Sequence, residues 1–156
     1  DFERISDHAV NILESAEEIK DKKLTFSETA KSELKTMFDA VNEILDIAFS
    51  AFEKNDLELA ITVEPLEQVI DYLKDYLKTQ HILRLQHGEC TIEMGFVLSD
   101  LLTNLERVSD HCSNIGLFVV AQHKQINPHD YAKKMHDGDD ENYRTYFEKY
   151  LSKYDV

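Results

Sequence analysis

The chain is poor in the residues that make turns and in those that cross-link small folds. Its 156 residues include four glycines, two prolines and no tryptophan. Because folds rich in strands need many tight turns, which glycine and proline largely supply, this composition argues against a sheet. The two cysteines, Cys90 and Cys112, form no CxxC pair and no disulfide framework. We therefore expect a helical protein of a reducing, cytosolic compartment.

Basic residues and long apolar runs are also scarce. The longest apolar run, residues 115–121, is far shorter than the roughly 18 residues that span a bilayer, so no direct membrane insertion is expected. Only 17 basic residues stand against 31 acidic ones, which gives a formal charge of −14. This charge repels the phosphates of nucleic acids and attracts cations. Nucleic acid is therefore not an expected partner.

Familiar catalytic motifs are missing as well. The sequence contains no glycine-rich phosphate loop, no serine elbow and no HExxH. None of its seven histidines follows a glutamate by three residues, so the Glu-x-x-His ligand pair of ferritin-like di-iron bundles is not present. These features predict that the protein is not an enzyme.

Apolar residues recur at three- and four-residue spacing almost throughout, which predicts α-helices. Pro65, about ten residues inside the third predicted long helix, should kink that helix or restart it. The predicted fold is all-α: an antiparallel helical bundle of four long helices within residues 1–122. A linker over residues 123–138 and a short amphipathic helix over residues 139–156, packed on the bundle, complete the prediction. Helices are expected to begin at capping boxes in residues 25–28 and 55–58.

The first helix is expected to pack as the fourth helix of that bundle. Its apolar seam should dock on the following helical hairpin or on a second chain, so a homo-oligomer is a further hypothesis. The seam consists of Phe2, Ile5, Ala9 and Ile12.

A motif from the start of the chain returns near its end, which indicates a duplicated structural unit. Residues 2–12 read FERISDHAVNI, and residues 105–115 read LERVSDHCSNI. Each copy places an acid, a second acid four residues later and an asparagine four residues after that on one helix face. The two rows are Glu3, Asp7, Asn11 and Glu106, Asp110, Asn114.

A third acidic row, Glu67, Asp71 and Asp75, has the same spacing. At 100° per residue all three rows fall beside the packing seam of their helices, so a site built from them should lie at the bundle surface. Crowded carboxylates favour hard cations, among them iron, manganese, magnesium and calcium. The alternative is that the acids only solvate the bundle and that Arg4 and Arg107 neutralise them. His8 and His111 point elsewhere and are expected to bond carbonyls or solvent rather than metal.

The repeated motif resembles the signature helix of PhoU proteins, and residues 67–71 (EQVID) resemble the second acid motif of that family. The stretch 90–114 is similar to the cytosolic PhoU-like domain at the C-terminus of bacterial sodium/phosphate cotransporter proteins. The resemblance covers about residues 1–122. It implies that the chain starts at the third helix of one three-helix repeat and contains the whole of the next.

The resemblance also implies a site and a function. Glu67 and Asp71 would join Glu106 and Asp110 in a surface metal cluster, with iron the leading candidate, whereas Glu3 and Asp7 would belong to a second, incomplete site. Supporting residues would be Asn11, Asn114 and Asp75. The implied protein is a non-catalytic regulatory domain of phosphate transport and homeostasis, cytoplasmic and attached at the inner membrane to the transporter portion of the same polypeptide. A metal-free interaction module is the alternative, and a carboxylate metalloenzyme ranks last.

Overall fold

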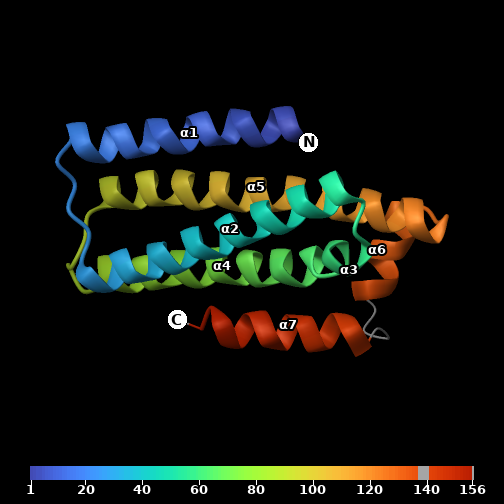
Figure 1. The fold of residues 1–156 in the computed structure, drawn as a ribbon. Coiled ribbons are helices and arrows are strands. Elements are labelled where there is room, and N and C mark those ends of the chain that lie inside the picture. Colours follow the sequence, from blue (N-terminus) through green and yellow to red (C-terminus); the bar gives the residue numbers. More distant parts are fainter. Residues whose placement is uncertain (137–140, 156) are drawn as a thin grey trace.

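A computed structural model of the protein describes residues 1–136 and 141–155. These residues form helices and no strand, so the all-α prediction is confirmed (Figure 1). Four helices are long and three are short. They are α1 (Phe2–Asp21), α2 (Glu28–Lys54), α3 (Leu57–Ala60), α4 (Val63–Gln86), α5 (Ile92–Lys124), α6 (Pro128–His136) and α7 (Glu141–Lys153).

Helix starts follow the local sequence signals. Ser27 caps α2 by accepting a hydrogen bond from the backbone N–H of Ala30, and Thr91 caps α5 in the same way. The third predicted helix is divided into α3 and α4, as the proline signal indicated. Pro65 lies in the first turn of α4, where its missing N–H leaves no hydrogen bond unmade.

Helices α2, α4 and α5 enclose the main hydrophobic core. The side chains of Met37, Ile44, Leu66, Ile70, Leu73, Leu102 and Leu105 are almost completely buried. On α2, the fully buried positions are Met37, Ala40, Ile44, Ala48 and Ala51, whereas Phe52 is 45% exposed. The small side chains of Ala40 and Ala48 let the three helices approach closely.

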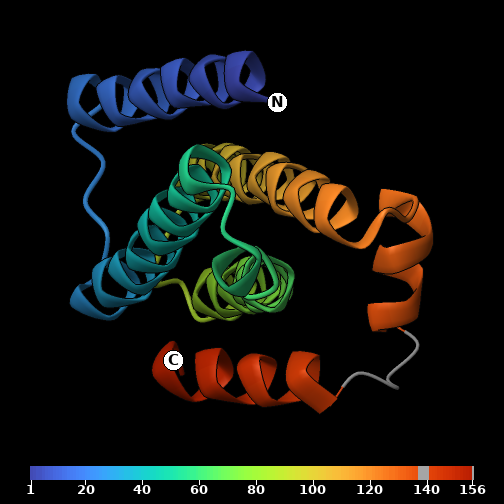
Figure 2. The same cartoon turned by 45° about the vertical axis from the view of Figure 1, so that its right-hand side comes forward.

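Helix α1 lies antiparallel along α5, on a side of α5 that α4 does not occupy (Figures 1 and 2). Lys22 near its end forms an ion pair of 3.0 Å with Glu93 near the start of α5. The predicted seam needs correction, because Ile5 is buried and Ile12 half-buried, but Phe2 and Ala9 are exposed. A helix that packs along one neighbour only has a narrow buried face, so half of the predicted seam remains outside.

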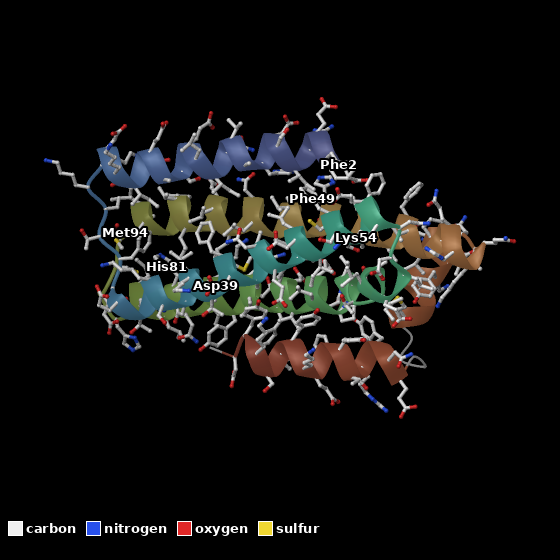
Figure 3. All side chains as sticks on the ribbon, in the orientation of Figure 1. Phe2, Asp39, Phe49, Lys54, His81 and Met94 are labelled. Atoms are coloured by element: carbon white, nitrogen blue, oxygen red, sulfur yellow. The ribbon has the colours of Figure 1, made fainter. Side chains whose placement is uncertain are left out.

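Phe2 nevertheless meets α2 at the end of the bundle (Figure 3). Its ring centroid lies 5.2 Å from that of Phe49 and 5.2 Å from that of Phe52. These contacts join the start of α1 to the end of α2.

The C-terminal helices wrap around one end of the bundle and return along α4 (Figure 2). Helix α6 lies inside the segment predicted as a linker, and its Tyr131 and Met135 are buried against Val119 and Val120 of α5. Helix α7 lies against α4 and buries Tyr150. Residues 137–140, where the predicted linker ends and the predicted last helix begins, lie outside the described residues.

No helix in the described ranges is both long enough and apolar enough to cross a membrane.

Candidate functional site

The structure brings the two acid rows of α4 and α5 face to face. Lys74 of α4 joins them, because its Nζ lies 2.6 Å from Oδ1 of Asp71 and 3.4 Å from Oε1 of Glu106. Nearer the start of α4, Glu67 lies close enough to Asp110 of α5 for the two negative charges to interact. All four predicted metal-binding carboxylates therefore lie along one α4–α5 flank, which we call the acid ladder.

Glu67 is the exceptional member of the acid ladder. Its residue is 7% exposed, whereas the side chains of Asp71 and Asp110 are 44% and 33% exposed. Burial, followed by the negative charge of Glu64, raises the pKa of Glu67 to about 8. The prediction of a surface site is thus wrong for this residue, because the neighbouring helices cover a position that helical periodicity alone leaves at the edge.

Glu64 belongs to the same cluster, and sequence reasoning missed it. It lies one turn before Glu67 on α4, is 6% exposed and accepts a hydrogen bond from the hydroxyl of Ser113 on α5. The available signal was its spacing of three residues from Glu67, which places both on one face of a helix. The close approach of the helices depends on Gly116, since a Cβ there would lie 2.9 Å from Cβ of Val63.

The protein supplies part of the positive charge that the acid ladder needs. Lys74 bridges two acids, and Nη1 of Arg107 lies 3.4 Å from Oδ2 of Asp110. Within residues 1–136 and 141–155, no three His, Cys, Asp or Glu side chains are arranged to hold a metal ion. The oxygen donors fit a hard cation in their chemistry and in facing one another. Full coordination requires Lys74 to turn away and Glu67 to lose its proton.

The other predicted site residues are not part of the acid ladder. Glu3 and Asp7 are exposed on α1, which packs along α5 rather than α4. Asp75 is also exposed, one residue beyond Lys74. Asn11 and Asn114, which were predicted as supporting residues, form hydrogen bonds between α1 and α5 instead.

These hydrogen bonds join the two copies of the repeated motif. On one side, Nδ1 of His8 lies 2.8 Å from Oδ1 of Asn104, and Nδ2 of Asn11 donates to the same oxygen at 3.0 Å. His8 and Asn11 of α1 therefore hold one side chain of α5 between them. His8 bonds a carbonyl oxygen, as predicted, because Oδ1 of Asn104 is the carbonyl oxygen of a side-chain amide.

The second side repeats this arrangement with the copies exchanged. Nδ1 of His111 lies 2.8 Å from Oδ1 of Asp1, and Nδ2 of Asn114 donates to that oxygen at 3.2 Å. Asp1 and Asn104 differ by the same 104 − 1 = 103 positions as the copies of the motif. The two motif helices are thus joined by a symmetric contact, which we call the polar clamp, and the recurrence of His and Asn has a structural explanation.

The fold and the site define a class: a helical bundle in which antiparallel helices turn acid-x-x-x-acid rows toward each other. Residues 34–119, more than half of the chain, match the PhoU domain. The chain belongs to the PhoU domain family, as the repeated motif predicted. The match includes all of α4 and most of α5, whereas α1, α6 and α7 lie outside it.

A curated relative supports this assignment. Over 115 residues the chain is 31% identical to the phosphate-specific transport system accessory protein PhoU homolog 1 of Thermotoga maritima. The alignment covers 74% of this chain and 49% of the relative, so the chain spans about half the length of the curated relative that it matches. No solved structure matches the chain at a significant level.

Proposed function

We propose that this protein is a non-catalytic regulatory domain of phosphate transport that responds to a cation held on the acid ladder. Membership of the PhoU family and similarity to a protein named as an accessory of a phosphate-specific transport system support the transport role. The observation that supports a bound cation is that Glu67 and Asp71 of α4 face Glu106 and Asp110 of α5.

The setting that we propose is the cytoplasmic side of a sodium-dependent phosphate transporter, with the membrane portion in the same polypeptide. The similarity of residues 90–114 to the PhoU-like domains of sodium/phosphate cotransporters supports it. The measurement is sodium-driven phosphate uptake by cells that express the natural polypeptide with and without substitutions in the acid ladder. Uptake that never depends on sodium contradicts this setting.

The cation would be held by the carboxylates of Glu67, Asp71, Glu106 and Asp110. When bound, a multivalent ion of iron, manganese, magnesium or calcium would offset their negative charge and offer a positive centre to a phosphate oxygen. Glu67 would give up its proton on binding, because only the carboxylate is a good ligand. Lys74 would turn its ammonium group toward solvent, since two positive groups cannot occupy the same position between Asp71 and Glu106.

Metal analysis of the purified protein, followed by calorimetric titration with each cation, tests this site. Glu67→Gln combined with Asp110→Asn should remove binding, because both changes keep the shape and delete the charge. Glu3→Gln combined with Asp7→Asn is the matched control, since these acids have the same spacing on α1 and lie outside the acid ladder. Equal loss of binding in both variants would show that bound cations report only the overall negative charge.

A metal-free interaction module is the second candidate, and Lys74 is the observation that favours it. Its ammonium group already forms ion pairs with both Asp71 and Glu106 in the described structure. If the acid ladder is complete in this form, a chelator should leave the melting temperature unchanged and metal analysis should find no cation. That pair of results would remove the cation from the proposal.

A further inference from the structure

Helix α7 returns along α4, and its start lies toward the end of the bundle where α4 begins (Figures 1 and 2). Glu64 and Glu67 lie in the first turns of α4. Tyr143, in its first turn, packs against the small cluster that joins α3, α5 and α6. Burial, followed by the negative charges of Glu64 and Glu67, raises the pKa of the Tyr143 phenol to about 12. The start of α7 therefore lies next to the two most buried carboxylates of the molecule's acidic flank.

The other end of α7 is fastened to α2. Glu43 accepts a hydrogen bond from Nζ of Lys153 at 2.7 Å and another from the hydroxyl of Tyr154. Tyr150 and Tyr154 are 5% and 6% exposed, and both belong to the main core cluster. Apolar burial and two donors on one carboxylate thus hold α7 in place.

Exposure along the acid ladder is uneven. Asp71 and Asp110 have side chains that are 44% and 33% exposed, so solvent reaches the acid ladder at both of these residues, whereas the side chain of Glu106 is 14% exposed. Glu64 and Glu67, at the end where α7 begins, are 6% and 7% exposed. A hydrated ion must shed much of its water shell to reach Glu67, and the side that α7 occupies gives it no route.

We propose that α7 is a reversible cover of the Glu64–Glu67 end of the acid ladder, that the contact of Lys153 and Tyr154 with Glu43 holds it closed, and that release of α7 favours cation binding at Glu67. Helix α7 lies outside residues 34–119, so the proposed cover is not part of the segment that matches the PhoU domain. Its coupling to cations rests on the proposed function, whereas its effect on access to Glu64 and Glu67 does not.

The first test measures access without any cation. Lys153→Met with Tyr154→Phe removes both donors to Glu43 and retains the apolar bulk of α7, and Lys149→Met, at an exposed position of the same helix, is the control. Carbodiimide-activated labelling of carboxyl groups, read by mass spectrometry, reports access to Glu64 and Glu67, with exposed Asp46 as the internal reference. Amide hydrogen exchange in α7 shows in the same samples whether the helix has been released.

If α7 covers these carboxylates, labelling of Glu64 and Glu67 should rise about threefold or more in the double variant. Labelling of Asp46 should not change, and the Lys149→Met control should be labelled like the natural protein. A second variant, a chain that ends after residue 140, removes α7 entirely and should give at least the same increase while keeping its helix content by circular dichroism. If α7 is released or removed and labelling of Glu64 and Glu67 does not change, the cover is refuted.

The second test adds Mn²⁺ to the same proteins and measures binding by electron paramagnetic resonance. Because a closed fraction lowers the apparent affinity in proportion, release of α7 should raise the affinity by about tenfold. Equal affinity in all forms, with raised labelling, refutes the coupling between α7 and cations. No bound Mn²⁺ in any form, again with raised labelling, counts against the proposed cation site and supports the cover alone.

Discussion

The imidazole rings of His8 and His111 stack with their centroids 5.6 Å apart, at an angle of 26° between the ring planes. They occupy equivalent places in the two copies of the motif, 111 − 8 = 103 positions apart in the sequence. Because the copies run antiparallel, the local two-fold axis that relates α1 to α5 passes between these two rings. Residues that recur in the sequence thus meet their own counterparts in space.

The polar clamp should contribute measurably to the docking of α1. Asn104→Ala removes the acceptor shared by His8 and Asn11, and we expect a loss of about 1–2 kcal/mol in the free energy of unfolding. Denaturant titration measures this value. A double-mutant cycle of His8→Ala with Asn104→Ala should give a coupling of about 1 kcal/mol, because the two residues are in contact.

The matched cycle pairs His8→Ala with Lys35→Ala on α2. Lys35 forms its own ion pair of 2.5 Å with Asp39 and is 74% exposed in its side chain, so these two changes should add independently. A coupling between His8 and Asn104 no larger than in this control would contradict the clamp.

The pH dependence of stability should reveal the raised pKa of Glu67. Folded Glu67 holds its proton up to about pH 8, whereas the unfolded carboxyl loses it near 4.5, so its stabilising contribution is present at low pH and lost as pH rises between these values. Glu67→Gln removes this dependence. Above pH 8 the variant should exceed the natural protein in unfolding free energy by about 2 kcal/mol, measured in chelator by denaturant titration across pH.

The corresponding control is Asp75→Asn, which changes an exposed carboxyl two turns further along the same helix. Its profile should follow that of the natural protein. A Glu67→Gln variant whose stability falls with pH as steeply as that of the natural protein would assign the dependence to other groups.

Lys74 should act as an internal counter-ion of the acid ladder. Lys74→Met leaves Asp71 and Glu106 facing each other without a cation, so we expect a loss of about 1 kcal/mol in unfolding free energy. Millimolar Mg²⁺ or Mn²⁺ should restore more stability to this variant than to the natural protein, as thermal melts would show. Lys78→Met, one turn further along and 3.3 Å from a threonine hydroxyl, is the control and should show no cation effect of this kind.

Gly116 should be intolerant of a side chain. Alanine at this position would place its Cβ 2.9 Å from Cβ of Val63, and neither backbone can yield without opening the α4–α5 contact. We expect Gly116→Ala to cost about 1–3 kcal/mol, although alanine is the better helix former. Gln122→Ala, at an exposed position of α5, should be neutral in the same denaturant titration.

A good part of the site was visible in the sequence. The acid-x-x-x-acid spacing of Glu67 with Asp71 and of Glu106 with Asp110 places each pair on one helix face, which is a local property of helical geometry. The facing of the two pairs required the family resemblance, which the match over residues 34–119 now supports. The burial of Glu67 and the bridge made by Lys74 were not visible, because both depend on how closely two helices approach.

The sequence by itself determined the four long helices of this protein, the helix starts at Ser27 and Asp56, the break before Pro65 and the duplicated motif. These features follow from interactions between residues a few positions apart, which the order of residues encodes directly. Only the tertiary structure decided which side of α5 receives α1, that the repeated His and Asn residues form the polar clamp, and that α7 ends on Glu43. The reason is physical: each of these contacts joins residues about a hundred positions apart, and packing selects them from many pairings that local sequence leaves equally open.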